Sequence, residues 1–498
     1  MLVFISDLHF TDGTSSASVD AGAVELFAER LNDLAERASW RTGGQYKPIE
    51  QIDLVLLGDT IDLLRSSRWQ ETNARPWSET NSPAFIETVR KIVDGVLNHN
   101  ATSLQYLRAL ASHGGIALAP ASASGQPVFG AELVAVPVHI HYMVGNHDWM
   151  LRQRGAEYDA IRRKISQYFG LAHDGRQPFA HEPAEAGTLQ EALRRHRVFA
   201  RHGDVFDPLS FHQDRNESSV SDLLVIELTS HFLADVEQQL GEHLPAATLA
   251  NLRELDHVRP QLFAPVWLES LLDRTCPSST QRREIFRRWD AHVDRLLQSD
   301  VLRQWDNDSP HQLRDGLQRS LMFRKRAAHD WTSRTGDWLN SMRGAANASY
   351  WQHAIAEPEF RNRRAKYIVY GHTHQCETTP LEASYADGFA LQQIYFNTGT
   401  WRRVYQTTRW QPAGHEFIPT ETMSYLSFFA GDERGGRPFE CWSGTLGALT
   451  PAASVHRLDV GRASHASPES VPTSNVPIAR PHFASTPAAA RASAAQRR

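Results

Sequence analysis

The sequence of 498 residues has few cysteines, no long apolar run and no excess of basic charge. Its three cysteines, Cys276, Cys376 and Cys441, are widely spaced. This spacing argues against a disulfide scaffold and indicates a reducing compartment. No stretch approaches the roughly 18 apolar residues of a membrane span. The formal net charge of -5 gives no reason to expect general attraction to nucleic acid.

The start of the chain also lacks the pattern of a secretion signal, because no basic segment precedes an apolar stretch. The chain opens on MLVFISDLHF, in which Asp7 and His9 come directly after the first apolar run. If these two side chains are functional, nothing can be removed from this end. We therefore expect a cytoplasmic protein.

Five short apolar runs predict buried strands: LVFIS (2–6), IDLVLL (52–57), VHIHYMV (138–144), RVFAR (197–201) and KYIVY (366–370). Each has the length of a buried strand and is rich in β-branched or aromatic residues. Helical patterns lie between them at 23–40, 84–97 and 158–170, where apolar residues recur with the helix period. Strands that alternate with helices predict an α/β fold with a parallel component in its sheet.

The interval 205–360 reads as helical and predicts an α-helical insertion, a possible substrate-selecting lid. Apolar residues at helix spacing mark one helix from Val220 to Leu240 and another from Ile285 to Leu296. We expect an α/β core at 1–204 and 361–457, with short strands after residue 390. Residues 458–498 are rich in Ala, Ser, Pro and Arg, a composition that predicts a disordered tail.

Two residue types stand out in the helical interval. Its tryptophans are expected to pack in its core, and they are Trp267, Trp289, Trp305, Trp331, Trp338 and Trp351. Its basic stretch is expected to be a solvated helix face, with a phosphate-steering patch as the alternative. That stretch contains Arg282, Arg283, Arg287 and Arg288.

Polar residues follow each of the five predicted strands immediately. They are Asp7 and His9; Asp59 and Asp62; Asn146, His147 and Asp148; His202 and Asp204; and His372 and His374. Ligands bind outside the carboxyl ends of strands in open α/β sheets, so we expect these groups to converge on one rim. Oxygen and imidazole donors without a thiolate suit Mn, Fe or Zn, and there are enough for two ions. Gly58, Gly145 and Gly371 would let the backbone turn sharply there.

The ordered motifs DxH, GDxxD, GNHD, HG and GHxH resemble those of the calcineurin-like metallophosphoesterase superfamily. The resemblance covers residues 1–204 and 361–400, and it implies a β-sandwich flanked by helices. It implies one metal held by Asp7, His9 and His374, a second held by Asn146, His202 and His372, and Asp59 as the bridge. It also implies that His147 faces the substrate and that Asp62 orients His147.

The implied reaction is the hydrolysis of a phosphomonoester or phosphodiester, by in-line attack of a hydroxide shared by two divalent ions. His147 would donate a proton to the leaving group, and Asp62 would raise the pKa of that imidazole. Asp62 can alternatively cap the helix expected after it. Asp148 and Asp204 are expected to support ligands or cap turns. The stretch FNTGTW (396–401) is expected to form a tight turn that supports the ligand loops.

Other substrates within the superfamily stay open. Leu63 and the GNHD motif lower the expectation of a Ser/Thr protein phosphatase. A UDP-sugar-lipid pyrophosphatase would suit the helical insertion, although that enzyme usually has Arg where this chain has His147. DNA-repair nucleases share GNHD but usually expose more basic surface. A non-catalytic scaffold is the least expected class, because every ligand position is filled.

Overall fold

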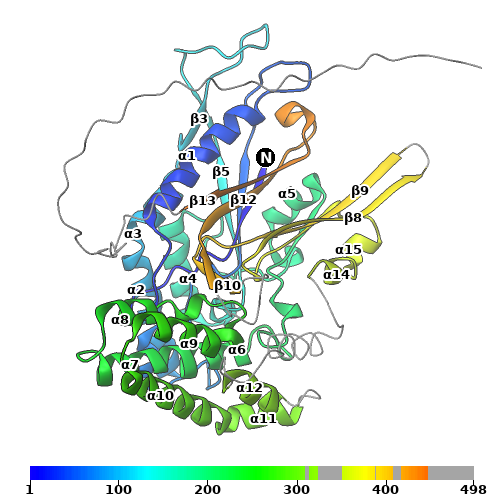
Figure 1. Ribbon diagram of the computed structural model, residues 1–498. Helices are drawn as coiled ribbons and strands as arrows, with labels where there is room; N and C mark the ends of the chain where they lie inside the picture. Colours follow the sequence, from blue (N-terminus) through cyan, green and yellow to red (C-terminus); the bar gives the residue numbers. More distant parts are fainter. Residues whose placement is uncertain (309–312, 323–349, 387–388, 408–416, 447–498) are drawn as a thin grey trace, which may run out of the picture. The chain divides into compact units, whose positions relative to one another are not determined.

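The chain folds into several sheets and many helices, as the alternating pattern of its sequence predicts (Figure 1). The computed structural model describes residues 1–308, 313–322, 350–386, 389–407 and 417–446. All of them belong to one unit, Met1–Pro451. The division into a core and a helical insertion stays a prediction, and the tail expected at 458–498 lies outside the described residues.

The first sheet has the strand order β13-β12-β1-β2-β5. Its strands are β1 (Leu2–Ile5), β2 (Ile52–Leu57), β5 (Val138–Met143), β12 (Thr422–Phe428) and β13 (Phe439–Thr445). β1, β2 and β5 run parallel, and β12 and β13 are antiparallel to their neighbours. The carboxyl ends of β1, β2 and β5 therefore lie at the same edge.

The second sheet has the strand order β6-β7-β9-β8. Its strands are β6 (Val198–Ala200), β7 (Tyr367–Tyr370), β8 (Cys376–Ala386) and β9 (Phe389–Thr398). β6, β7 and β9 run parallel, while β8 is antiparallel to β9. The five strands expected from the apolar runs are thus β1, β2, β5, β6 and β7, and all five predictions are confirmed.

Side chains of both sheets meet in one buried cluster. Leu2 and Phe4 of β1 belong to this cluster, as does Val369 of β7. Val3 and Ile5, the alternate residues of β1, belong to a different cluster that contains helix side chains. Successive side chains of a strand point to opposite faces. β1 therefore contributes one face to the cluster shared by the sheets and its other face to the helices.

Four helices pack on the first sheet, and side chains cap the first two of them. They are α1 (Ala21–Ala38), α2 (Pro83–His99), α3 (Ala101–Ala111) and α4 (Ala156–Phe169). The side chain of Asp20 accepts a hydrogen bond at the start of α1, and that of Ser82 does so at the start of α2. Pro83 takes the first turn of α2, where no backbone donor is needed. The three helical patterns predicted before residue 205 are confirmed.

Helices also fill much of the interval from 220 to 321. They are α6 (Val220–Leu223), η5 (Leu224–Ser230), α7 (His231–Leu240), α8 (Ala246–Leu252), η6 (Leu255–His257), η7 (Gln261–Phe263), α9 (Ala264–Thr275), α10 (Ser279–Leu297), α11 (Asp300–Asp308) and α12 (Leu313–Leu321). Both helices expected from the apolar spacing are present, because α6, η5 and α7 follow one another without a break.

The core of this helical part contains Trp267 and Trp289, both almost fully buried, as expected. Trp305 packs against the same core, whereas Trp351 packs against a cluster with Tyr370. Trp331 and Trp338 lie outside the described residues. The arginines of α10 have polar partners on the protein: Arg282 pairs with Asp273, Arg283 contacts Thr280, Arg287 pairs with Glu284, and Arg288 pairs with Asp235. A solvated, ion-paired face accounts for this stretch.

Shorter elements complete the described chain. They are β3 (Ile116–Leu118), β4 (Val134–Val136), α5 (Thr188–His196), β10 (Val404–Thr407), β11 (Phe417–Thr420), α14 (Tyr350–Ala354), α15 (Pro358–Arg361), η1 (Ser67–Gln70), η2 (Trp149–Arg152), η3 (Pro183–Glu185), η4 (Asp204–Phe206) and η10 (Glu433–Gly436). Throughout the described ranges, the helices lack the length and apolarity needed to cross a membrane.

Candidate metal centre

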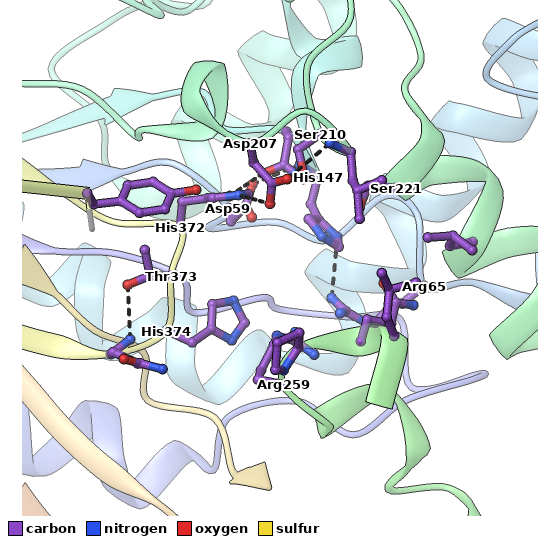
Figure 2. Close-up of a pocket in the computed structure, with 18 of the residues that line it drawn as sticks. Asp59, Arg65, His147, Asp207, Ser210, Ser221, Arg259, His372, Thr373 and His374 are labelled. Atoms are coloured by element: carbon purple, nitrogen blue, oxygen red, sulfur yellow. Dashed lines mark hydrogen bonds and ion pairs between the residues drawn. The ribbon is translucent and has the colours of Figure 1, made fainter. Parts of the chain in front are cut away.

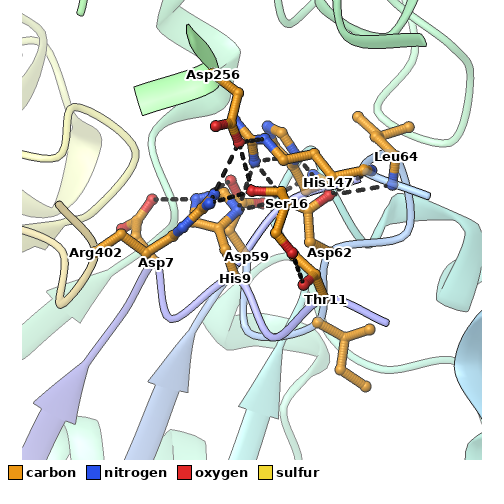
Figure 3. A network of polar contacts seen from close by, with 12 residues as sticks. Asp7, His9, Thr11, Ser16, Asp59, Asp62, Leu64, His147, Asp256 and Arg402 are labelled. Carbon is orange, nitrogen blue, oxygen red and sulfur yellow. Dashed lines mark hydrogen bonds and ion pairs between the residues drawn. The ribbon is translucent and has the colours of Figure 1, made fainter. Parts of the chain in front are cut away.

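The polar residues that follow the five strands lie together in the structure (Figures 2 and 3). Loops after β1, β2, β5, β6 and β7 deliver them, so residues far apart in sequence become neighbours. The expected convergence on one rim is therefore observed. The side chains are buried except for His372, which is partly exposed at a pocket.

The first group of converging donors consists of Asp7, His9 and His374. Asp7 Oδ1 lies 3.9 Å from His9 Nε2 and 3.5 Å from His374 Nε2, and the two nitrogens lie 3.0 Å apart. Asp7 Oδ1 is buried and has no hydrogen-bond partner among the described residues. A buried carboxylate oxygen without a donor is costly, so this position fits a cation.

The second group consists of Asp59, His202 and His372, with Asn146 beside them. His202 Nδ1 lies 3.0 Å from the carbonyl oxygen of Leu57, to which it donates. Its Nε2 then faces two oxygens, Asp59 Oδ2 at 3.3 Å and Asn146 Oδ1 at 3.2 Å. His372 Nδ1 lies 2.9 Å from the same Asn146 oxygen. Oxygen and imidazole lone pairs that face one another need a proton or a metal ion between them.

Asp59 touches both groups. Its Oδ2 lies 3.7 Å from His9 Nε2 as well as 3.3 Å from His202 Nε2, and its Oδ1 accepts the backbone N–H of His147 at 2.8 Å. Burial alone would raise the pKa of Asp59, but the charges of His202 and His147 hold it well below its usual range. The side chain is thus an anion placed between the two groups, which is the position expected of a bridge.

Burial and neighbouring charges shift the pKa values of the candidate ligands. Burial lowers the pKa of His202, but Asp59 and Asp7 outweigh it and raise the pKa to about 10. Burial raises the pKa of Asp7 to about 6. The pKa of His9 and that of His374 are held well below the usual value, chiefly by burial. The first group therefore offers neutral imidazoles, the form that binds metals, and the second group attracts a cation.

Asp62 contacts His147, as expected, but it has further partners. Its Oδ1 lies 3.1 Å from His147 Nδ1, and its Oδ2 lies 2.9 Å from His9 Nδ1. The same Oδ1 accepts the backbone N–H groups of Leu64 and Arg65 at 3.1 and 3.0 Å. Asp62 therefore holds His147 and also caps a turn at Leu64 and Arg65. The expected helix cap is wrong, because the next helical element is η1, and Ser66 caps it.

Backbone conformation is unusual at five of the expected ligands. Asp7, His9, Asp59, His372 and His374 all have positive φ, between 46° and 68°. Such conformations cost about 1–3 kcal/mol each for residues other than glycine, and they gather at functional sites. The loops thus hold these side chains in positions that the backbone would not adopt by itself.

The three glycines expected at sharp turns allow close packing. A Cβ atom at Gly371 would lie 2.7 Å from Asp7 Oδ2, and one at Gly145 would overlap the Asp59 carboxylate. A Cβ at Gly58 would overlap the ring of His202, and Gly58 itself has a φ of 82°. The absence of a side chain at these positions is what lets the loops meet.

The turn after β9 supports the ligand loops, as predicted for FNTGTW. Asn397 Nδ2 donates to the carbonyl oxygen of Gly371 at 2.7 Å. Thr400 Oγ1 donates to the carbonyl oxygen of Asp7 at 2.6 Å. One turn thus fixes the loops that carry the first and last ligands of the first group.

A buried charge cluster behind the centre was not anticipated from the sequence (Figure 3). Arg65 pairs with Asp62, and its Nε lies 2.7 Å from Asp256 Oδ2. Arg402 Nη2 lies 3.2 Å from the same oxygen, and Ser16 Oγ donates to it at 2.8 Å. Arg65 stands three residues after Asp62, which is a weak local signal. Asp256 and Arg402 carry no such signal, because only the fold brings them to the site.

Other carboxylates support the loops. Asp207, which the sequence did not suggest, lies 3.1 Å from His372 Nε2. Asp148 accepts hydrogen bonds from Gly145 N and from the hydroxyl of Tyr142. Asp204 forms a two-fold ion pair with Arg215. Asp148 therefore caps the GNHD turn, whereas Asp204 holds a later segment.

A pocket of about 320 Å³ opens on the centre (Figure 2). Residues of both ligand groups line it, among them Asp59, Asn146, His372 and His374. Its wall also contains His147, Arg65 and the segment Arg259–Leu262 from the helical part. A small anionic ligand in this pocket would contact the candidate metal centre and the helical part together. No family model matches the chain, and no curated protein matches it.

Proposed function

We propose that the chain is a metal-dependent phosphoesterase of the kind its motifs resemble. The observation that carries this proposal is that one carboxylate, Asp59, lies between two groups of donors. A β-sandwich of the metallophosphoesterase type belongs to the proposal, and the buried cluster common to both sheets supports it. A cytoplasmic location belongs to it as well, and the free state of all three cysteines is consistent with this.

The chain's own residues would hold two divalent ions, whether Mn, Fe or Zn. Asp7, His9 and His374 would bind one ion; Asn146, His202 and His372 would bind the other; and Asp59 would bind both. The unpartnered Asp7 Oδ1 and the acceptor-lined His202 Nε2 support this assignment. Two such ions would polarise a phosphoryl group and lower the pKa of an attacking water.

His147 would act on the leaving group. Its Nδ1 is engaged by Asp62, so Nε2 is the atom left for the substrate in the pocket. A carboxylate at Nδ1 fixes the orientation of the ring, and Nε2 would then donate a proton to a departing oxygen. The substrate is therefore a phosphomonoester or phosphodiester whose leaving oxygen reaches His147.

The test is the hydrolysis of p-nitrophenyl phosphate and of bis-p-nitrophenyl phosphate by protein loaded with Mn²⁺. We expect turnover that disappears with a chelator, and about two ions per chain by elemental analysis. Asp59→Asn should lower both metal content and turnover, and the exposed-site variant Asp300→Asn should change neither. A wild-type protein that binds no divalent ion and cleaves neither ester would refute the proposal. The ratio of the two rates separates a phosphatase from a phosphodiesterase.

A further inference from the structure

The helical part contributes one wall of the pocket at the candidate metal centre. The segment that follows η6 reaches the pocket with Arg259, Pro260, Gln261 and Leu262. A backbone hydrogen bond from Arg259 N to the carbonyl oxygen of Tyr405 at 3.0 Å anchors this segment to β10. The wall is therefore a fixed part of the described structure, and its charged member is Arg259.

Arg259 differs from the two other arginines nearby in its partners. Arg65 and Arg402 both pair with Asp256, and both are buried. The Arg259 guanidinium donates through Nη1 to the carbonyl oxygens of Asp256 and Val258, at 2.6 and 2.9 Å. Within the described ranges, no carboxylate forms an ion pair with it. Arg259 is thus a cation held by neutral oxygens.

Arginines outnumber carboxylates in this cluster when Asp7 and Asp59, which also act on Arg259 and Arg65, are assigned to the candidate metal ions. Three arginines, Arg65, Arg259 and Arg402, are matched by two carboxylates, Asp62 and Asp256. Burial and the neighbouring arginines lower the pKa of Arg259 only to about 9, so it stays charged at neutral pH. A partly buried surplus cation is stabilised by an anion in contact with it. The pocket is where such an anion can lie.

The anionic residues of the pocket wall are already engaged. Asp207 Oδ2 lies 3.1 Å from His372 Nε2, and Glu377 Oε1 accepts a hydrogen bond from Thr379 at 2.7 Å. Arg259 lines the same pocket as the candidate metal ligand His374, and Figure 2 shows His374 and Arg65 on either side of it. An anion bound by Arg259 would therefore sit beside a phosphoryl group held at the metal centre.

We propose that Arg259 binds a second anionic group of the substrate, next to the phosphoryl group that reacts. The substrate class is then a phosphoester that carries another phosphate or a carboxylate close to the scissile bond. This inference rests on the proposed function. It assigns to the helical part a role in substrate choice, because Arg259 is the cation that the described residues of this part place in the pocket.

Binding of three unreactive anions tests the inference. The probes are inorganic phosphate, phosphonoacetate and methylenediphosphonate, titrated calorimetrically into Mn²⁺-loaded protein at fixed free Mn²⁺. Arg259→Met removes the charge at similar length, and Arg259→Lys keeps it. Arg253→Met is the matched control, because Arg253 is exposed and pairs with Glu237 away from this pocket.

We expect Arg259→Met to lower the affinity for methylenediphosphonate by about tenfold to a hundredfold, because a charge-assisted hydrogen bond contributes about that much. The affinity for phosphate should fall by less than about twofold. Arg259→Lys should retain part of the affinity, and Arg253→Met all of it. A matching loss for phosphonoacetate would show that the Arg259 site also accepts a carboxylate; no loss for phosphonoacetate would show that the site requires a phosphate-like group. Equal losses for all three anions, or no loss, would overturn the inference.

Two further results keep this test separate from that of the proposed function. If Arg259→Met fails to fold, Arg259→Lys must still bind methylenediphosphonate more tightly than phosphate, or the inference fails. If the wild type cleaves no ester but shows the Arg259-dependent preference, the anion site stands and the phosphoesterase proposal falls. If the wild type cleaves an ester but shows no Arg259-dependent preference, the phosphoesterase proposal stands and the anion site falls.

Discussion

Asp62 holds His9 and His147 at the same time, through its two different oxygens. One of these histidines belongs to the first ligand group, and the other faces the pocket. A single carboxylate thereby couples the geometry of a candidate ligand to that of the candidate proton donor. Both imidazoles present Nδ1 to Asp62, so each is left with Nε2 for its proposed task.

Asp62→Asn should therefore impair two properties together. An amide has only one accepting oxygen, so one of the two histidines loses its hydrogen-bond partner. We expect metal affinity to fall about 10- to 100-fold and turnover of the remaining loaded protein to fall as well. Calorimetric Mn²⁺ titration and rates at saturating Mn²⁺ measure the two effects. Unchanged metal affinity would show that His9 is held by other contacts.

His147→Ala should retain both metals and lose turnover. General acid catalysis contributes about 10²- to 10⁴-fold, and its loss matters most when the leaving group is a poor one. The decrease should be larger for phenyl phosphate than for p-nitrophenyl phosphate. His139→Ala is the control, because His139 is exposed at 46 % of its side-chain surface. Equal decreases for both esters would argue against His147 as the proton donor.

Gly145→Ala should disturb the centre through shape alone. The added methyl group would overlap the Asp59 carboxylate and lie 2.8 Å from His202 Cδ2. We expect loss of metal and of turnover. Gly43→Ala provides the contrast: its φ of 95° predicts a stability cost of about 1 kcal/mol, but no atom lies within 4 Å of its Cβ. Elemental analysis and thermal melts distinguish the two; full metal content in Gly145→Ala would contradict the packing argument.

Asp256→Asn should destabilise the fold. The substitution leaves Arg65 and Arg402 without their shared carboxylate, and breaking a buried pair costs about 3–5 kcal/mol. Urea denaturation at pH 7 measures the loss. The control is Asp300→Asn, because Asp300 forms an exposed ion pair with Arg303. It should change the free energy of unfolding by less than about 1 kcal/mol.

The effect of Asp256→Asn should also depend on pH. Burial would raise the pKa of Asp256, but His257, Arg402 and Arg65 hold it well below its usual value. A lowered carboxyl pKa contributes stability above the unfolded pKa, about 4, and this contribution is lost as the pH falls below it. The difference between wild type and variant should therefore be smaller at pH 3 than at pH 7. A difference that grows on acidification would contradict this sign.

Local patterns in the sequence predicted the parts of the centre that depend on strand ends. An apolar run, a glycine and a polar residue lie within a few positions, and parallel strands bring such ends together. The cluster of Arg65, Asp256 and Arg402 was not predictable in this way, because its members lie on segments without a shared motif. The positive φ of Asp7 and His9 left only a faint signal, since Asp and His adopt that conformation more often than most residues.

The chain order of the donor groups has a consequence for how the protein matures. Each group needs a histidine from the loop after β7, His374 for the first and His372 for the second. The second group is complete only once His372 has been synthesised, and the first only once His374 has followed it. Metal loading by either complete group is therefore a late event, and a nascent chain that has reached only β6 presents carboxylates and imidazoles but no finished site.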